Sequence, residues 1–391
     1  MHAMFYEQWN TPVRYACDVL VVGGGIAGVS AALAAARNNA NVILVERSFL
    51  AGGLATAGLV AIYLPIADGY GRQASFGIAE ELIRATAHCG TRDRFPEAWL
   101  KEGMTQEEQK ANTGISVEFN PNTYAIVLEK LLLNAGVRIL YGTIACAVKV
   151  ENERVEAVFA ENKSGRFAIV PQTVVDATGD ADLWHLAGGP TACAEEKNKL
   201  AAWYCYNDEA GIKLKILGMA DGSEQEPPLT KQRFQGIDGE ELSDWAIAAH
   251  QIIMEDLEKQ AEINTKYELA CLASIPQVRM TRRIVGAYTL KSKEKACQYV
   301  DSIGMIANWR ARGEIYEIPY GTLYSPNFSN MLAAGRCISA SGPMWDICRV
   351  IPGCATTGQA AGVAAAMQED VRKLSTDMLQ KKLAEQGVVF H

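Results

Sequence analysis

The chain has 391 residues, of which 49% are hydrophobic and 21% are charged, and its formal net charge is -8. These values indicate an ordered globular protein with a large core, and they exclude a disordered chain and a basic nucleic-acid-binding surface. Ten cysteines are scattered without a CxxC pair and only five histidines accompany them, so we expect reduced thiols and no metal site. No signal-peptide pattern is present, so we expect a cytoplasmic protein that binds neither membrane nor nucleic acid.

A glycine-rich segment follows the first predicted strand. Residues 18–22 are a short apolar run typical of a buried parallel strand, and an alanine-rich helix ends near Arg37. Between them, Gly23, Gly25 and Gly28 form the pattern G-x-G-x-x-G. Gly23 would permit a tight turn, Gly25 the close approach of a pyrophosphate, and Gly28 the close packing of helix on strand. The N–H groups at the start of the helix favour the phosphate charge, so the pattern predicts a dinucleotide site.

The second predicted strand, residues 41–45, ends at Glu46, whose carboxylate can accept hydrogen bonds from a ribose. After Arg47 comes a loop of small residues, "SFLAGGLATAGLV", which includes Gly53 and would let the backbone pass close to a flat ring system. A nicotinamide-dependent dehydrogenase would instead continue at once into a helix and strand. The loop therefore favours FAD over NAD.

Two features in the middle of the chain also favour a flavin. Residues 137–170 alternate apolar and polar side chains, with turns at 151–153 and 162–165, which is typical of a β-meander. The next strand, residues 173–175, ends in Ala177-Thr178-Gly179, whose small residues let the chain turn against a cofactor. A Rossmann-like core interrupted by a meander suits an FAD-binding domain.

The C-terminal part is expected to return to the nucleotide site. A strand over residues 331–334 breaks at Gly335-Arg336, and an alanine-rich helix is expected from about Ala355. Pro352 predicts an extended segment before that helix, with Arg349 beside the flavin. The helix dipole would stabilise negative charge on the flavin pyrimidine ring. The N–H groups at its start would come from Thr356, Thr357 and Gly358.

Three segments together, residues 18–60, 276–290 and 331–366, resemble the FAD-dependent oxidoreductase family of bacterial proteins, relatives of the glutathione-reductase-like flavoproteins. The resemblance implies noncovalent FAD. Many relatives have a cysteine at the position of Ala55 and a histidine at that of Gly342, so chemistry that depends on those side chains does not transfer. The implied cofactor-binding residues are Gly23, Gly25, Ile26, Ala27, Gly28, Glu46, Arg47, Gly53, Leu54, Ala145, Ala177, Thr178, Gly179, Gly335, Arg336, Arg349, Thr357 and Gly358.

The sequence thus predicts an α/β fold with a Rossmann-like FAD-binding domain, an inserted β-meander and a mixed α+β substrate domain. We expect the FAD-binding domain to be discontinuous, the substrate or cap domain to lie between its pieces, and a helical tail to follow. The FAD-binding pieces are residues 15–60, 121–190 and 325–370; the cap comprises 61–120 and 191–324; the tail is 371–391.

Three residues are candidates for catalysis: Arg349, Arg279 and Tyr320. On a strand, Arg279 and Arg283 would share one face and Arg282 would point away, giving either a clamp for a carboxylate or phosphate or a solvated strand edge. Tyr320 is a candidate proton donor.

The function we expect is flavin-dependent hydride transfer with a small, anionic or neutral organic substrate. His185 is expected to be structural. Two alternatives stay open, namely an FAD-binding protein without turnover in a larger redox complex and an NAD-dependent dehydrogenase. There is no second G-x-G-x-x-G, so the electron donor or acceptor is unknown, and a homo-oligomer is compatible with the sequence.

Overall fold

The computed structural model describes residues 6–90, 116–209, 211–220 and 227–391. Its centre is a seven-stranded sheet in the order β5-β2-β1-β8-β7-β6. The seventh strand, β16, pairs with the carboxyl end of β8. Strands β5, β2, β1, β8 and β16 are parallel, whereas β6, β7 and β8 are consecutive antiparallel neighbours. The strands are β1 (Val13–Val22), β2 (Val42–Val45), β5 (Arg138–Leu140), β6 (Ile144–Glu151), β7 (Arg154–Asn162), β8 (Gly165–Asp176) and β16 (Met331–Ala333).

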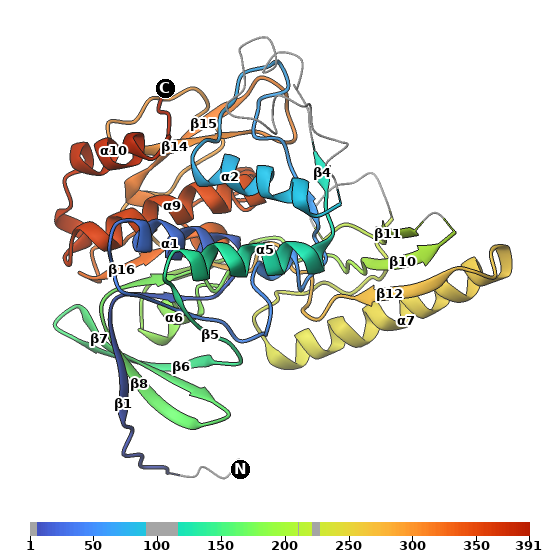
Figure 1. Cartoon of the computed structure of the whole chain (residues 1–391), viewed down its shortest axis with the longest axis horizontal. Helices are drawn as coiled ribbons and strands as arrows, with labels where there is room; N and C mark the ends of the chain where they lie inside the picture. The colour runs from blue at the N-terminus through green and yellow to red at the C-terminus, as the bar shows by residue number, and fades with distance from the viewer. Residues whose placement is uncertain (1–5, 91–115, 210, 221–226) are drawn as a thin grey trace.

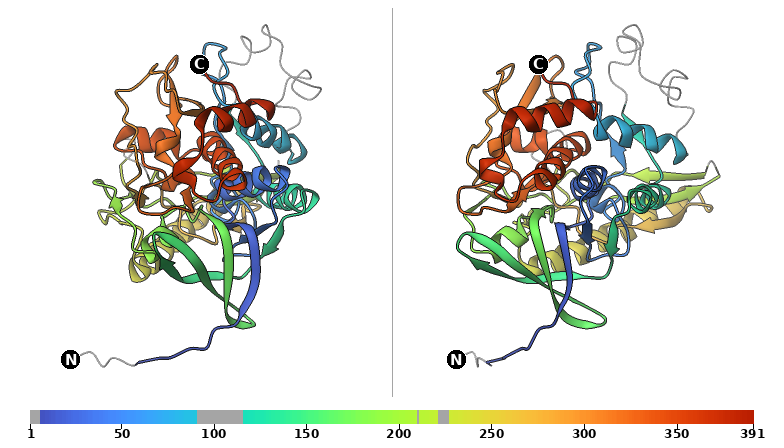
Figure 2. Two further views of the ribbon diagram at one scale, coloured as in Figure 1. Left: turned by 90° about the vertical axis from the view of Figure 1, so that its left-hand side faces the viewer. Right: turned by 60° about the vertical axis from the view of Figure 1, so that its left-hand side comes forward.

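The side chains of residues 19–22, at the end of β1, alternate between two different cores, which is why this part of the strand is apolar. Val19 and Val21 belong to a core shared with the helices above the sheet, and Leu20 and Val22 to a core on the opposite face. The helices of the first core lie side by side above the sheet (Figures 1 and 2). They are α1 (Ile26–Arg37), α2 (Ile78–Ala85), α5 (Pro121–Asn134) and α9 (Ile351–Met367), with α10 (Thr376–Glu385) beside them.

Helices α1 and α9 pack with almost no space between their backbones. A Cβ added at Gly358 would lie 2.3 Å from the carbonyl oxygen of Ala27, and one at Gly362 would lie 2.1 Å from that of Ala31. Small residues in "GQAAGVAAA" therefore serve helix packing, and they bring the C-terminal part of the chain back to the first βαβ unit.

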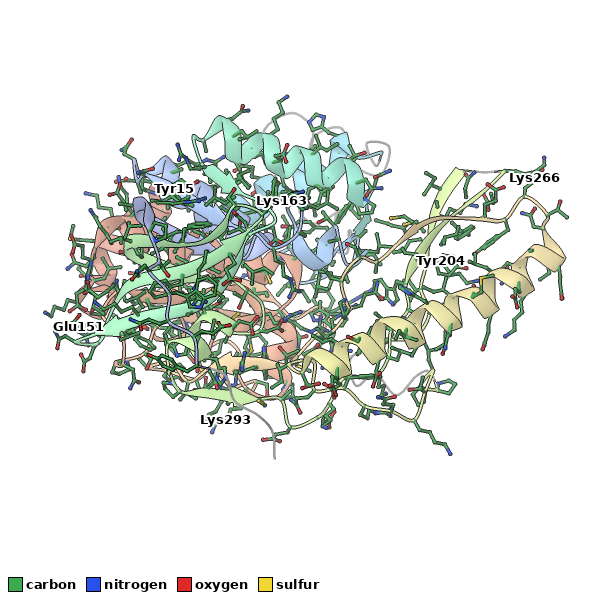
Figure 3. The ribbon with its side chains drawn as sticks, turned by 90° about the horizontal axis from the view of Figure 1, so that it is seen from below. Tyr15, Glu151, Lys163, Tyr204, Lys266 and Lys293 are labelled. Atoms are coloured by element: carbon green, nitrogen blue, oxygen red, sulfur yellow. The ribbon has the colours of Figure 1, made fainter. Side chains whose placement is uncertain are left out.

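A projecting arm carries a third core. The arm consists of β10 (Tyr204–Asp208), β11 (Gly211–Lys215) and β12 (Glu268–Leu272), which form an antiparallel sheet, and the long helix α7 (Gly239–Ile263). Figure 3 shows Tyr204 inside the arm and Lys266 at its tip. Trp203, Phe234 and Trp245 fill the core where the arm joins the body.

The remaining described elements are short. They are β3 (Ile62–Tyr63), β4 (Val117–Glu118), α6 (Asp182–Leu186), β9 (Thr191–Cys193), β13 (Arg282–Ile284), β14 (Ser302–Ala307), β15 (Ile315–Pro319), α8 (Pro343–Cys348) and 3-10 turns at Gly53–Ala55, Thr86–His88, Tyr320–Thr322, Gly335–Cys337 and Val371–Lys373. Of the helices in the described ranges, none combines the length and apolar character needed to cross a membrane.

The alanine-rich helix in the last part of the chain begins earlier than expected. Helix α9 starts at Ile351 rather than near Ala355, and residues 343–348 form the separate helix α8. The predicted extended segment before Pro352 is therefore wrong apart from Val350, which has φ -71° and ψ 163°. The reason is that Pro352 lies in the first turn of the helix, where proline needs no hydrogen-bonded N–H.

Candidate functional site

A cavity of about 480 Å³ opens at the carboxyl ends of four parallel strands. Gly23 follows β1, Glu46 follows β2, Ala177 follows β8 and Ala334 follows β16, and all four residues line the cavity. Ligands of open α/β sheets bind at this edge. The cavity has a second wall, which we call its cap side, lined by Trp203, Ile216, Met219, Gly236, Ile237, Gly239, Leu242, Ile275, Pro276, Val278 and Arg279.

The three glycines of the G-x-G-x-x-G segment lie in three different environments. Gly23 has φ 101°, and a Cβ there would lie 2.4 Å from the carbonyl oxygen of Ala177. A Cβ at Gly28 would lie 1.8 Å from the carbonyl oxygen of Gly23, so the helix packs directly on the turn. A Cβ at Gly25 would meet nothing within 4 Å, and Gly25 lines the cavity. Gly25 thus faces open space at the start of α1, where backbone N–H groups have no partners inside the helix.

The carboxylate of Glu46 is buried and accepts backbone hydrogen bonds. Its Oε2 accepts from Gly24 N at 2.6 Å and its Oε1 from Ser48 N at 2.7 Å. Each oxygen keeps a further lone pair, and Glu46 lines the cavity beside the exposed Arg47. Gly52 N also donates to Gly24 O at 2.7 Å. The loop that contains Gly53 and Leu54 is therefore joined to the glycine-rich turn.

Asp176 organises the turn after β8, and sequence reasoning missed it. Its Oδ1 accepts from Thr178 N and from Thr178 Oγ1, at 3.0 and 2.7 Å, and its Oδ2 accepts from Trp184 N at 2.8 Å. Burial raises the pKa of this carboxyl group to about 6, although the three hydrogen bonds lower it. An acidic residue that ends an otherwise apolar strand, as in "TVVDATG", was the available signal.

Arg336 joins the turn after β8 to the turn after β16. Its guanidinium donates to Gly179 O, to Val278 O and to Asp180, with Nη2 2.6 Å from Oδ1. Burial opposes the charge, but the adjacent Asp180 carboxylate raises the pKa of Arg336 above its ordinary value. Arg336 lines the cavity, and its contacts fix the position of Gly179 against Gly335 rather than leaving the whole side chain for a ligand.

Thr357 and Gly358 lie away from the place expected for them. Because α9 begins at Ile351, Thr357 is inside the helix and buried, with Oγ1 2.8 Å from Gly353 O and 3.0 Å from Gly335 N. Gly358 packs on Ala27. The expectation that Thr356, Thr357 and Gly358 offer N–H groups to a flavin is therefore wrong. The residues of this segment that line the cavity are Arg349, Val350, Ile351 and Cys354.

Arg349 lines the cavity as expected, and it is part of an ion-pair cluster. Its Nε donates to Asp346 Oδ1 at 2.8 Å, its Nη2 also contacts Asp346, and Arg310 Nε contacts the other oxygen of Asp346. The side chains of Arg349 and Asp346 are both less than 10% exposed. The guanidinium of Arg349 lies 5.9 Å from the ring of Trp309, which also lines the cavity.

The three arginines of residues 276–290 lie in different environments. Arg279 is buried in the cap side of the cavity, 5.2 Å from the ring of Trp203, and donates to Gln277 O. Strand β13 begins only at Arg282, so Arg279 and Arg283 do not share a strand face, contrary to expectation. Arg282 pairs with Asp182 at 2.7 Å, and Arg283 lies 5.7 Å from the ring of Trp345.

Tyr320, Ala145 and His185 do not line the cavity. Tyr320 is buried, and its hydroxyl group donates to Val371 O at 2.9 Å, while burial raises its pKa well above the ordinary value. The structure thus gives Tyr320 a packing role, contrary to the expectation of a proton donor. Ala145 lies in β6 opposite Ala160, and His185 is exposed on α6.

The apolar residues of the cap side could not be found from the sequence. Trp203 lies just before β10, Ile237 just before α7 and Leu242 within α7, and they reach the cavity only because the arm folds against the sheet edge. In the described part of the chain, no group of three or more His, Cys, Asp or Glu side chains could hold a metal ion.

The residues at the sheet edge fit a dinucleotide. Gly25 leaves space in front of the N–H groups of α1, and Glu46 offers buried carboxylate oxygens next to that space. The donor set is that required by a diphosphate and a ribose.

Comparisons with known proteins also indicate a protein that binds a dinucleotide. Residues 18–204 and 223–385 match the family model described as FAD dependent oxidoreductase. No curated protein sequence matches the chain.

Solved structures resemble the chain only distantly. A geranylgeranyl bacteriochlorophyll reductase-like protein from Thermoplasma acidophilum is 14% identical, with TM-score 0.48, over 95% of this chain and 83% of that chain. The p-nitrophenol 4-monooxygenase of Pseudomonas putida is 12% identical, with TM-score 0.48, over 95% of this chain and 84% of its own. An aromatic hydroxylase from angucycline biosynthesis is 14% identical, with TM-score 0.46, and the match covers 95% of this chain and 65% of that chain.

The family match spans most of the chain and includes the carboxyl end of every strand that ends at the cavity. The protein is an enzyme with FAD as its cofactor, and the chain belongs to the FAD-dependent oxidoreductase family.

Proposed function

We propose that the cavity at the sheet edge binds FAD and that a small organic molecule enters from its cap side to exchange a hydride with the flavin. The observation that carries this proposal is the meeting of two chemically different walls in one cavity. The sheet edge offers N–H groups and the Glu46 carboxylate, whereas the cap side is mostly apolar. A diphosphate needs the first wall, and an organic substrate is suited to the second.

In this proposal the turn at Gly25 and the start of α1 hold the diphosphate, and Glu46 accepts from the ribose. The turn at 177–179 and the start of α9 border the flavin. The isoalloxazine ring, when bound, supplies the hydride chemistry, and the protein supplies orientation and charge. Dipoles at the start of α9 would favour negative charge on the ring. The division into a discontinuous FAD-binding domain, with a meander between its pieces, and a cap remains part of this proposal.

Arg349 and Arg279 have different proposed roles. Arg349 lies beside Ile351, the first residue of α9, and would bring positive charge close to the flavin. Arg279 lies on the cap side against Trp203 and would contact the substrate. A guanidinium in an otherwise apolar wall would select a ring or chain that carries a polar or anionic group.

Anaerobic mixing of the oxidised enzyme with a panel of small organic molecules tests the cap-side assignment. A substrate should bleach the flavin absorbance. The variant Leu242→Trp would fill the cap side and is expected to retain FAD while losing the bleaching. Bleaching at the wild-type rate in this variant would place the substrate elsewhere.

A further inference from the structure

Two cysteines face each other across the sheet of the arm. Cys205 on β10 and Cys271 on β12 are direct partners in the antiparallel register. Directly opposed residues project to the same face, with Cβ atoms about 4.5–5.5 Å apart. A disulfide requires about 3.5–4.5 Å between these atoms. Within the strands that the structure describes, no other two cysteines are register partners.

An irregularity beside this pair lets the strands approach. The register passes from Cys205 opposite Cys271 to Tyr206 opposite Leu269, so Ala270 is an extra residue without a partner. Such a bulge interrupts the ladder of hydrogen bonds and bends the strand. The two Cβ atoms can therefore move about 1 Å closer together, as a disulfide requires, without breaking the hydrogen bonds of a regular ladder.

The two thiols differ in access. Cys205 is buried. This burial is the main reason why its pKa is raised to about 11, and the neighbouring Cys271 and Glu118 raise it further. Cys271 is half-buried, and its Sγ lies 3.6 Å from Leu272 O on the outer side. An external reagent therefore reaches Cys271 first.

We propose that Cys205 and Cys271 form a reversible disulfide by exchange with a small-molecule disulfide such as glutathione disulfide. The Cys271 thiolate attacks one sulfur of the external disulfide and releases one thiol, leaving a mixed disulfide on Cys271. The Cys205 thiolate then attacks Cys271 Sγ and releases the second thiol. The two protons lost by the cysteines are taken up by the two released thiolates, and the external disulfide gains the two electrons that the cysteines lose.

The position of the pair connects the disulfide to the cavity. Trp203 lines the cavity two residues before Cys205, and Ile275 lines it four residues after Cys271. Gln277 lies in the segment after β12 and joins it to the start of β10, since its Oε1 accepts from Trp203 N at 2.9 Å. Its Nε2 donates to Gly58 O at 2.6 Å, in the loop of small residues after β2. A cross-link at the pair would therefore hold the cap side of the cavity in one arrangement. This consequence, unlike the disulfide itself, rests on the proposed function.

Peptide mapping of the whole protein under non-reducing conditions tests the disulfide. The protein is incubated with glutathione disulfide or with reduced glutathione, and remaining thiols are then alkylated. The expected result is one cross-linked peptide pair that contains Cys205 and Cys271 and disappears with dithiothreitol. Either Cys271→Ser or Cys205→Ser should abolish it. Cys193→Ser and Cys297→Ser, which remove exposed thiols, are matched controls and should leave it intact.

The disulfide is overturned if no cross-linked peptide pair containing Cys205 and Cys271 appears, whether glutathione stays on Cys271 or cross-links form at Cys193 or Cys297 instead. Because Cys271 is half-buried, Cys271→Ser keeps the test valid if Cys205→Ser does not fold.

Hydrogen exchange tests the connection to the cavity. Oxidation should slow amide exchange in β10, β12 and the segment around Trp203 by about tenfold, as expected for a cross-link that restricts local opening. Slowing in the strands without any change around Trp203 would contradict the connection. A cross-link in protein that fails to bind added FAD would refute the proposed function while leaving the disulfide standing.

Discussion

Arg349 and Asp346 form a buried ion pair across the junction of α8 and α9, with Arg349 Nε 2.8 Å from Asp346 Oδ1. Arg310 contacts the same carboxylate, so two guanidinium groups share one carboxylate at the edge of the cavity. The guanidinium of Arg349 thus lies in the wall of the cavity, where its positive charge would stabilise a flavin that becomes negative on reduction.

Replacing Arg349 should lower the reduction potential of the bound flavin. A charge-assisted contact contributes about 1.5–3 kcal/mol. For a two-electron couple this corresponds to about 30–60 mV. We expect Arg349→Ala to shift the midpoint potential down by that amount and, with a substrate in hand, to slow turnover roughly ten- to a hundred-fold. Arg349→Lys should recover part of the shift, because an ammonium group lacks the planar fork. An unchanged potential in Arg349→Ala would remove this residue from the flavin site.

Gly25→Val should abolish FAD binding and preserve the fold. A side chain at Gly25 meets no protein atom within 4 Å, so it would occupy only the space proposed for the diphosphate. Gly239→Val is the matched control, since Gly239 also lines the cavity and also has no atom within 4 Å of an added Cβ, but lies on the cap side. The control should keep its FAD. Stoichiometric FAD in soluble Gly25→Val would show that the diphosphate lies elsewhere.

The buried carboxyl group of Asp176 should make stability depend on pH. Its pKa is raised from 3.8 to about 6, so the folded protein retains this proton at pH values where the unfolded chain has lost it. The stabilisation is complete below about pH 4 and is lost as the pH rises through 6. From pH 4 to pH 7 the free energy of unfolding of the wild type, relative to Asp176→Asn, should fall by on the order of 2 kcal/mol. Denaturant titrations at several pH values measure this difference, and a difference that grows with pH would refute it.

Tyr320→Phe should destabilise the protein without changing its chemistry. The substitution leaves the buried carbonyl group of Val371 without the hydroxyl donor at 2.9 Å, at a cost of about 1–3 kcal/mol. Urea unfolding should show this loss, while the FAD content and the rate of flavin reduction stay at wild-type values. A tenfold loss of flavin reduction at unchanged stability would restore Tyr320 as a proton donor.

Local patterns predicted the parts of the site that depend on local geometry. Gly23, Gly25 and Gly28 occupy the turn that their spacing indicated, and Glu46 follows the second strand. The short loop and helix between two parallel strands leave little freedom there, so spacing alone locates these residues.

Contacts between distant segments were not predictable in the same way. Arg310 contacts Asp346, and the hydroxyl group of Tyr320 donates to the carbonyl group of Val371, and neither pairing has a periodicity or motif in the sequence. The start of α9 was misplaced because Pro352 was interpreted as ending an extended segment, although proline is equally suited to the first turn of a helix. The cap side depends on how the arm packs, which is a tertiary property.

Identification of the bound cofactor is the decisive experiment for an FAD site in this protein. The protein, purified without added nucleotide, is denatured, and the released chromophore is separated and identified. We expect a yellow protein that releases FAD, and not FMN, in about a one-to-one ratio to the chain. A colourless protein that also fails to bind added FAD, or a protein that releases a nicotinamide dinucleotide instead, would contradict it.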